Sequence, residues 1–352
     1  MSELVRAALA AVVDGRRLSM DEARGAMGAV MDGEATPSQL AALLVALRMR
    51  GETVDELAGF AEAMRGRVVR VQAPAGAIDT CGTGGDHSGT FNISTAAALV
   101  VASAGVPVAK HGNRAITSAA GSADVLDALG IRTDLTAPEA AAALRTEGFA
   151  FLFALAYHPA MKHAGPTRRE IGVRTAFNLL GPITNPAGTS RQVVGVGDPA
   201  AAPKIAEVLR LLGTERALVV HGAGLDELPL DGSGVMYDVT PSGVARSEVV
   251  AEFLGLRAAA TSELAGGNAA VNASLVEAVL AGERGPRRDV VLLNAAAGLM
   301  VAGRAADLRS GIELASATIV SGAATALLRR LRAARSAHDA AQAAAAIQGV
   351  PA

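Results

Sequence analysis

The stretch IDTCGTGGDHSGTFNIST, residues 78–95, joins a short apolar segment to a second apolar run through a glycine-rich loop. Glycine has no Cβ, so the backbone N–H groups of such a loop can approach a ligand closely and φ can be positive. The second run reads as a helix that starts near Asn92, and the first N–H groups of a helix are unpaired and favour an anion. The stretch therefore predicts a strand, a phosphate- or pyrophosphate-binding loop and a helix. Its spacing matches neither G-x-x-x-x-G-K-[ST] nor G-x-G-x-x-G, so a purely structural tight turn is the alternative.

The chain after Pro74 repeats this order of strand and helix. Short apolar segments predict buried strands at 106–112, 148–154, 191–197, 216–222 and 289–295. Longer segments predict helices at 94–105, 122–130, 201–213 and 294–303, with one or two closing helices after residue 317. This alternation predicts an α/β fold in which helices flank a mostly parallel sheet. Ligands of such sheets bind beyond the carboxyl ends of the strands.

The first 66 residues predict a small all-helical domain, which begins with a helix near residues 3–13. Three capping boxes, in which a hydroxyl and an acid or amide satisfy backbone donors, mark helix starts at Ser19–Glu22, Thr36–Gln39 and Thr53–Glu56. A helical stretch at about 167–180 is expected to cross back to this domain. We therefore expect a helical domain over 1–72, joined by part of 160–188, an α/β domain over 73–352, and a cleft that the two share.

Composition narrows the classes of function. Of the 352 residues 51% are hydrophobic, which is enough for a sizeable core. A net charge of −2, with no Trp and two Tyr, argues against general affinity for nucleic acid or anionic membranes and against a base-stacking platform. The single cysteine, Cys81, excludes an internal disulfide and is interpreted as a small strand-end residue. Since Glu3 and Arg6 interrupt the first apolar stretch and no apolar run reaches membrane-spanning length, a cytoplasmic protein is expected.

Two further polar clusters follow predicted strands. The first, KHGNRAITSAAGSAD at 110–124, looks like a second phosphate cradle, now with positive charge, although a solvated basic loop is the alternative. The second, HGAGLDELPLDG at 221–232, contains the adjacent acids Asp226 and Glu227. Adjacent carboxylates are usually solvated, but Mg²⁺ prefers one or two carboxylates together with waters and substrate phosphates. Beside two phosphate loops, the pair predicts a magnesium site.

Three arginines, Arg168, Arg169 and Arg174, are predicted to lie on one helix. The guanidinium group presents a fork that matches a carboxylate. Arg168 lies nearest the end that faces the cleft and is the candidate for binding a substrate carboxylate. Ordinary surface charge is the favoured interpretation of Arg169 and Arg174.

These clusters, in this order, closely resemble the anthranilate phosphoribosyltransferase family. The resemblance covers nearly the whole chain, through GTGGD and TFNIST at 82–95, KHGNR and GSADVLDALG at 110–130, HPAMK, RREIGVRTAFNLLGPITNPA, HGAGLDEL and LNAAAGLMVAG. It implies a nucleoside phosphorylase/phosphoribosyltransferase-like fold and a homodimer joined through the helical parts. It also implies Mg²⁺-dependent transfer of phosphoribose from 5-phosphoribosyl 1-pyrophosphate to anthranilate, in tryptophan biosynthesis.

The resemblance also implies roles for particular residues. The phosphoribosyl donor would be held by Gly82, Gly85, Asp86, Thr90, Asn92, Ile93, Ser94, Thr95, Lys110, Ser118 and Ser122. Anthranilate would contact Gly82, His111, Asn113 and Arg168, and Mg²⁺ would bind Ser94, Asp226 and Glu227. No residue is expected to act as a dedicated acid or base, because positioning and electrostatics would carry the catalysis.

Three departures from the family pattern, His87, Thr117 and Ala119, are expected to alter donor affinity or loop mobility and not the reaction. Two other functions remain as alternatives. A pyrimidine nucleoside phosphorylase would share the fold, but such enzymes are longer and carry a Lys-His-Ser-Thr-Gly-Gly-type loop. A non-enzymatic nucleic-acid-binding relative is disfavoured by the acidic net charge.

Overall fold

Four helices make up the N-terminal part of the computed structural model, which describes residues 1–86, 88–115 and 119–347. They are α1 (Glu3–Val13), α2 (Met20–Met31), α3 (Pro37–Arg50) and α4 (Val54–Arg65). All three predicted capping boxes are present, at the starts of α2, α3 and α4. Local signals decided these helix starts, because each hydroxyl accepts the N–H three residues later while the acid or amide reaches back.

The chain after residue 77 builds one seven-stranded sheet in the order β3-β2-β1-β4-β5-β6-β7. The strands are β1 (Ile78–Gly82), β2 (Val108–Gly112), β3 (Phe149–Phe153), β4 (Arg191–Gly195), β5 (Arg216–Gly222), β6 (Ser233–Thr240) and β7 (Gly243–Val250). The first five in sequence are parallel, and Ile78 of β1 pairs with Val108 of β2 on one side and Arg191 of β4 on the other. The expected fold class, a helical part plus a mostly parallel sheet flanked by helices, is confirmed.

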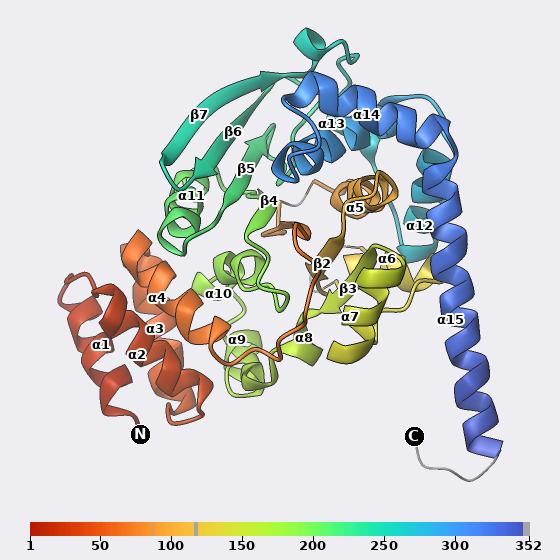
Figure 1. The fold of residues 1–352 in the computed structure, drawn as a ribbon. Coiled ribbons are helices and arrows are strands. Elements are labelled where there is room, and N and C mark those ends of the chain that lie inside the picture. The colour runs from red at the N-terminus through yellow and green to blue at the C-terminus, as the bar shows by residue number, and fades with distance from the viewer. Residues whose placement is uncertain (87, 116–118, 348–352) are drawn as a thin grey trace.

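Helices cover both faces of the sheet (Figure 1). On one face α5 (Ile93–Ser103) and α13 (Pro286–Val301) pack on side chains such as Ile78 and Val193. On the other face α11 (Ala202–Leu211) and the N-terminal helices share a core with Val194 and Val219. Alternate residues of a strand point to opposite faces, so one strand serves both cores. The remaining helices are α6 (Ser122–Ala128), α7 (Ala137–Thr146), α8 (Ala154–Tyr157), α9 (Gly165–Ile171), α10 (Ala176–Leu180), α12 (Ala269–Leu280), α14 (Leu308–Val320) and α15 (Ala323–Ile347).

Two predictions about elements were wrong. The expected strand at 289–295 is part of α13, which begins with Pro286 at a helix start and is buried from Val290 to Val301. A short apolar run that is buried all round cannot be told from a strand by its periodicity. The single helix expected at 167–180 is broken into α9 and α10, because Gly172 ends α9 with φ of +69°. The antiparallel hairpin of β6 and β7 was not anticipated.

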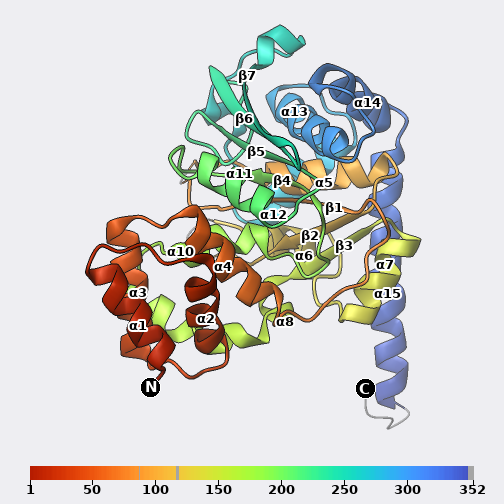
Figure 2. The ribbon, with the colours of Figure 1, turned by 60° about the vertical axis from the view of Figure 1, so that its left-hand side comes forward.

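The segment after β3 returns to the N-terminal helices. α9 and α10 contact α3 and α4, and Ala176 and Phe177 belong to the same buried cluster as Leu47 and Phe60. Figure 2 shows α10 beside α4 at the edge of the helical group. Met64 of α4 and Thr83 after β1 line one cavity, so the helical part and the sheet border a shared cleft. The boundary at 72/73 and the assignment of part of 160–188 to the helical domain stay predictions.

No single helix in the ranges 1–86, 88–115 and 119–347 is both long and apolar enough to cross a membrane. α14 and α15 reach that length and apolarity only when taken together, and they meet at a bend of 61°.

The capping boxes of Glu56 and Glu22 look alike in the sequence, but we expect their removal to lower the free energy of unfolding by different amounts. The buried carboxylate of Glu56 accepts the N–H groups of Leu18 (2.8 Å) and Thr53 (2.9 Å) and pairs with Arg50. Glu56→Ala leaves these groups without their acceptor, and because Arg50 is partly exposed we expect a loss of about 2 kcal/mol in the free energy of unfolding. The matched variant is Glu22→Ala, which removes an exposed capping box and should cost about 1 kcal/mol or less. Urea unfolding followed by circular dichroism measures both, and equal losses would contradict the prediction.

Candidate functional site

The carboxyl ends of β1 and β2 open into a cavity of about 570 Å³. β1 lies between β2 and β4, so this is the point where the strand order reverses, and open α/β sheets bind ligands at such points. Every described residue of the predicted donor set lines the cavity, namely Gly82, Gly85, Asp86, Thr90, Asn92, Ile93, Ser94, Thr95, Lys110 and Ser122. Ser118, together with His87 and Thr117, lies outside the described residues.

The glycine-rich loop needs its glycines for two separate reasons. Gly84 and Gly85 have φ of +59° and +68°, a region that other residues rarely adopt. Gly82 has no such constraint, but a Cβ there would lie 2.3 Å from Oδ2 of Asp226. The same carboxylate oxygen accepts the N–H of Gly84 at 2.8 Å. The loop is therefore folded tightly onto the Asp226 carboxylate.

The start of α5 faces the cavity, as expected, but its contacts differ from a simple cap. The side chain of Asn92 accepts from Asn272 of α12 (2.8 Å) and donates to the carbonyl of Ala120 (3.2 Å), so it links α12 to the loop before α6 instead of capping α5. The N–H of Ser94 donates to Oε1 of Glu227 at 3.0 Å. A carboxylate at a helix N-terminus is electrostatically favourable. The helix start and the predicted metal-binding acid are thus in direct contact.

Lys110 is a buried residue that lines the cavity. Its Nζ donates to the carbonyl of Thr80 at 2.6 Å and to Oγ of Ser94 at 3.5 Å. Burial lowers the pKa of Lys110, while the charge of Asp79 acts in the opposite sense. Asp79 was not singled out from the sequence, although an acid inside an apolar strand is a signal. It is fully buried, accepts the N–H of His111 at 3.1 Å, and burial raises its pKa to about 6.

Three carboxylates gather at one side of the cavity, those of Asp86, Asp226 and Glu227. Burial raises the pKa of Asp226, and the charge of Asp86 raises it further. Burial and then the charge of Asp226 raise the pKa of Glu227. The site therefore holds more negative charge than Lys110 neutralises, and a cation would relieve it. In the described part of the chain no three His, Cys, Asp or Glu side chains form a metal site by themselves. The donor set fits Mg²⁺, which completes its shell with waters and phosphates.

A second cavity of about 220 Å³ adjoins the first and shares Gly82, His111 and Asn113 with it. All four residues of the predicted anthranilate set, these three and Arg168, line the second cavity. The guanidinium carbon of Arg168 lies 4.8 Å from the ring centroid of Phe177, and burial lowers the pKa of Arg168. The structure thus brings the two predicted substrate sets together at one shared wall.

His158 also lines the second cavity and was missed, although it opens the HPAMK motif. Its ring centroid lies 5.2 Å from that of His111. Within the described residues, neither Nε2 atom has a hydrogen-bond partner. Burial lowers the pKa of His111 to about 3 and that of His158 to about 4, so both rings are neutral at pH 7.

The buried imidazole of His158 predicts acid sensitivity of the fold. In the unfolded chain the imidazole takes up a proton near its ordinary pKa of about 6.5, whereas in the native chain its pKa is about 4. The stability that this difference provides is therefore fully present above pH 6.5 and is lost as the pH falls towards 4. We expect His158→Gln to flatten the pH dependence of unfolding in this window by up to about 1.4 kcal/mol per pH unit. Urea unfolding at several pH values measures the slope, with the exposed His163→Gln as the matched control. Equal slopes for wild type and His158→Gln would contradict the prediction.

Arg174 is not the surface charge that the sequence suggested. Its Nη1 donates to the carbonyl of Gly84 at 2.7 Å and its Nη2 to that of Thr83 at 3.4 Å. The break at Gly172 takes Arg174 off the helix of Arg168 and Arg169. Arg169 is exposed, in agreement with the prediction.

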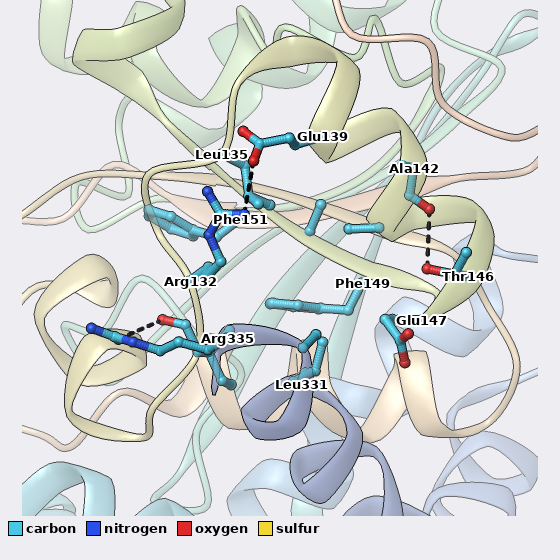
Figure 3. Close-up of a pocket in the computed structure, with 14 residues that line it drawn as sticks. Arg132, Leu135, Glu139, Ala142, Thr146, Glu147, Phe149, Phe151, Leu331 and Arg335 are labelled. Atoms are coloured by element: carbon cyan, nitrogen blue, oxygen red, sulfur yellow. Dashed lines mark hydrogen bonds and ion pairs between the residues drawn. The ribbon is translucent and has the colours of Figure 1, made fainter. Parts of the chain in front are cut away.

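Another cavity, of about 220 Å³, lies apart from the predicted site residues, between α7, β3 and α15 (Figure 3). Its floor is apolar, with Phe149, Phe151 and Leu331. The arginines on its rim are already paired, Arg132 with Glu139 of the same rim at 2.9 Å (Figure 3) and Arg335 with Asp127 outside the cavity at 3.6 Å. None of the predicted donor, acceptor or metal residues lines it.

Comparison with known proteins covers both parts of the chain. Residues 6–68 match the glycosyl transferase family helical bundle domain, and residues 75–325 match the glycosyl transferase family a/b domain. Anthranilate phosphoribosyltransferase of Roseiflexus sp. (strain RS-1) is 52% identical over 330 residues, which cover 93% of this chain and 97% of the relative. The enzyme of the same name from Azorhizobium caulinodans is 51% identical, over 94% of this chain and 96% of its own.

Solved structures agree. The crystal structure of anthranilate phosphoribosyltransferase from Thermus thermophilus superposes with a TM-score of 0.88 at 45% identity, over 93% of this chain and 98% of that one. The Saccharomyces cerevisiae enzyme in complex with PRPP and Mg superposes with a TM-score of 0.87 at 25% identity, over 96% and 99% of the two chains. On identity of this extent over nearly the full length, the chain belongs to the anthranilate phosphoribosyltransferase family.

Proposed function

We propose that this protein transfers the phosphoribosyl group of 5-phosphoribosyl 1-pyrophosphate to the amine of anthranilate, releasing N-(5-phosphoribosyl)anthranilate and pyrophosphate, in tryptophan biosynthesis. One observation carries the proposal: the polar cavity at the strand ends and the smaller cavity with Arg168 share a wall at Gly82, His111 and Asn113. Two substrates bound in these cavities would meet at that wall. The activity is the one named for the family.

The donor would occupy the larger cavity. Its phosphates would find the N–H of Gly85 in the glycine-rich loop and hydroxyls at Ser94, Thr95 and Ser122. Lys110 supplies a buried positive charge beneath them. Fixed donors of this kind favour an anion without having to reorganise when the charge on it grows. The assignment of Ser118 to the same set rests on the family resemblance alone.

Mg²⁺ would be held by Asp226, Glu227 and the hydroxyl of Ser94, and when bound it would offset the negative charge that pyrophosphate gains on leaving. Support comes from the uncompensated carboxylates described above. The solved yeast enzyme, in complex with PRPP and Mg, binds the same pair of ligands. Asp86, at the edge of the loop, adds to the charge that such a cation would neutralise.

Anthranilate would occupy the smaller cavity. The guanidinium of Arg168 matches its carboxylate, and Phe177 beneath holds that guanidinium in place. His111 and His158 are neutral, so they present an uncharged wall to the aromatic ring. Asn113, on the shared wall, is placed to orient the amine toward the donor.

The chain's own groups need do no covalent chemistry. The bond between C1 of the ribose and the pyrophosphate oxygen breaks, that oxygen keeps the electron pair, and the amine nitrogen forms the new bond to C1. An amine that has bonded to carbon loses its proton readily, so a dedicated base is not required. Positioning by Asn113 and Arg168, and stabilisation of pyrophosphate by the loop and Lys110, then carry the rate.

The direct test follows the loss of anthranilate fluorescence in the presence of the donor and Mg²⁺, with each omitted in turn. Turnover that needs all three components supports the proposal. Phosphate-dependent cleavage of a pyrimidine nucleoside without anthranilate turnover would support the phosphorylase alternative. Tight DNA binding in a gel shift without either activity would support the nucleic-acid-binding alternative.

We also propose a cytoplasmic homodimer joined through the helical parts. Leu4 on α1 and Val45 and Met49 on α3 are exposed apolar side chains that a partner copy would cover. Exposed apolar groups gathered on one part of a protein mark interaction surfaces. Sedimentation of the purified chain tests the dimer.

A further inference from the structure

Arg174 contacts the glycine-rich loop through two successive peptide groups. Its two terminal nitrogens donate to the carbonyls of Gly84 (2.7 Å) and Thr83 (3.4 Å). The contact is close, since a Cβ at Gly85 would lie 1.6 Å from Nη1 of Arg174. A guanidinium group is the side chain suited to this task, because its fork offers several N–H donors in fixed directions.

Because the peptide bond is planar, the contact of Arg174 with these carbonyls also fixes the direction of the N–H groups on the opposite face of the loop. In a trans peptide the C=O of one residue and the N–H of the next point in opposite directions. Carbonyls of Thr83 and Gly84 that point to Arg174 therefore aim the N–H groups of Gly84 and Gly85 the other way. The first of these N–H groups meets Asp226 at 2.8 Å, and both residues line the donor cavity.

Among the described residues, few other contacts hold this orientation, the nearest being the hydrogen bond of 3.4 Å that the Thr83 hydroxyl donates to the carbonyl of Gly84. Gly84 and Gly85 have unusually free backbones, and both adopt positive φ here. Thr83 is anchored to the end of β4, where its N–H donates to the carbonyl of Gly195 at 2.9 Å and its hydroxyl accepts the N–H of Gly197 at 3.2 Å. The other described contacts that orient Gly84 come from Asp226 on one side and Arg174 on the other.

The place of Arg174 in the chain connects the loop to the acceptor side. Arg174 lies between α9, which carries Arg168, and α10, which carries Phe177. The side chain of Asn178 accepts the N–H of Thr175 at 2.9 Å and so fixes the start of α10 directly after Arg174. One short link thus contacts the walls of both cavities.

We propose that Arg174 is a positioning residue, which holds the Thr83 and Gly84 carbonyls so that the N–H of Gly84 meets Asp226 and the N–H of Gly85 faces the pyrophosphate of the donor. The proposal rests on the proposed function. It assigns to Arg174 no contact with either substrate. Its effect is on the affinity for the donor, through the geometry of the loop.

The test compares Arg174→Ala and Arg174→Lys with Arg169→Ala, an exposed arginine of the same segment. We expect Arg174→Ala to raise KM for the donor about 10-fold, the cost of about one hydrogen bond to a charged group, with KM for anthranilate within about twofold of wild type. Lysine cannot reach both carbonyls with a fixed fork, so Arg174→Lys should be intermediate. Millimolar guanidinium, but not methylammonium, should partly restore donor KM in Arg174→Ala, a rescue that general loss of structure would not allow.

Binding of inorganic pyrophosphate by calorimetry separates this proposal from the proposed function. If the wild type binds pyrophosphate but does not use anthranilate, the function fails while the loop proposal is still tested by the affinity of Arg174→Ala. Equal pyrophosphate affinity, or equal donor KM, in wild type and Arg174→Ala would overturn the role of Arg174. Loss of affinity in Arg169→Ala of the same size would overturn it as well.

Discussion

The double substitution Asp226→Asn with Glu227→Gln will remove Mg²⁺-dependent turnover and lower kcat by at least about 100-fold, on the scale of several kcal/mol that a bound cation supplies to a departing phosphate. Both amides keep an oxygen that can accept the N–H groups of Gly84 and Ser94, so the loop and the start of α5 keep their contacts. The change removes charge and little else. A titration of turnover against Mg²⁺ concentration, at saturating donor and anthranilate, measures the effect.

The same variant should be at least as stable as the wild type. Both residues are half-buried, and desolvation and a neighbouring negative charge raise the pKa of each, so at neutral pH folding costs free energy either to keep a carboxylate charged or to protonate it. Thermal unfolding without Mg²⁺ tests this, with Asp231→Asn, an exposed acid on the same loop, as the matched control. Normal metal dependence in the double variant would place the metal site elsewhere.

Arg168→Ala should lower kcat/KM for anthranilate about 100-fold while leaving KM for the donor within about twofold, because a charge-assisted pair with a carboxylate is worth about 1.5–3 kcal/mol. Arg168 lies against Phe177 in the smaller cavity and contributes nothing to the lining of the larger one. Initial rates with each substrate varied in turn separate the two parameters. Arg168→Lys keeps the charge without the fork and should recover part of the loss.

Arg169→Ala is the control for Arg168→Ala, since the two residues are adjacent and Arg169 is exposed. It should leave both parameters near wild type. Unchanged anthranilate kinetics in Arg168→Ala would show that the acceptor carboxylate binds elsewhere. A parallel rise in donor KM would show that Arg168 acts on the whole cleft.

The sequence predicted local structure correctly wherever one or two neighbouring residues decide it. The capping boxes of α2, α3 and α4 are of this kind, because a hydroxyl and an acid three residues apart close the same hydrogen bonds in any context. The strand, glycine-rich loop and helix of residues 78–95 are another case. The sequence also predicted that the polar clusters after β1, β2 and β5 lie at the same edge of the sheet, because the carboxyl ends of parallel strands meet there.

Burial and long-range contacts were beyond such reasoning. α13 was divided between a strand and a helix, because an apolar segment that is buried on every side shows no face. The link between α9 and α10 was predicted as continuous helix, because the sequence pattern around Gly172 does not show that its φ is positive. The prediction of Arg174 as surface charge was wrong because its partners lie about 90 residues away in the chain, beyond the reach of any local pattern.

The sequence by itself determined the helix starts, the alternation of strand and helix, and which residue types gather at the strand ends. Only the tertiary structure decided how those groups act on one another: that Glu227 meets the start of α5, that Arg168 lies on Phe177, and that Arg174 holds the glycine-rich loop. The physical reason is the distance along the chain over which each interaction acts. Propensities and caps act within one helical turn, whereas desolvation, repulsion between carboxylates and the direction of a guanidinium group depend on which distant segments the fold brings together.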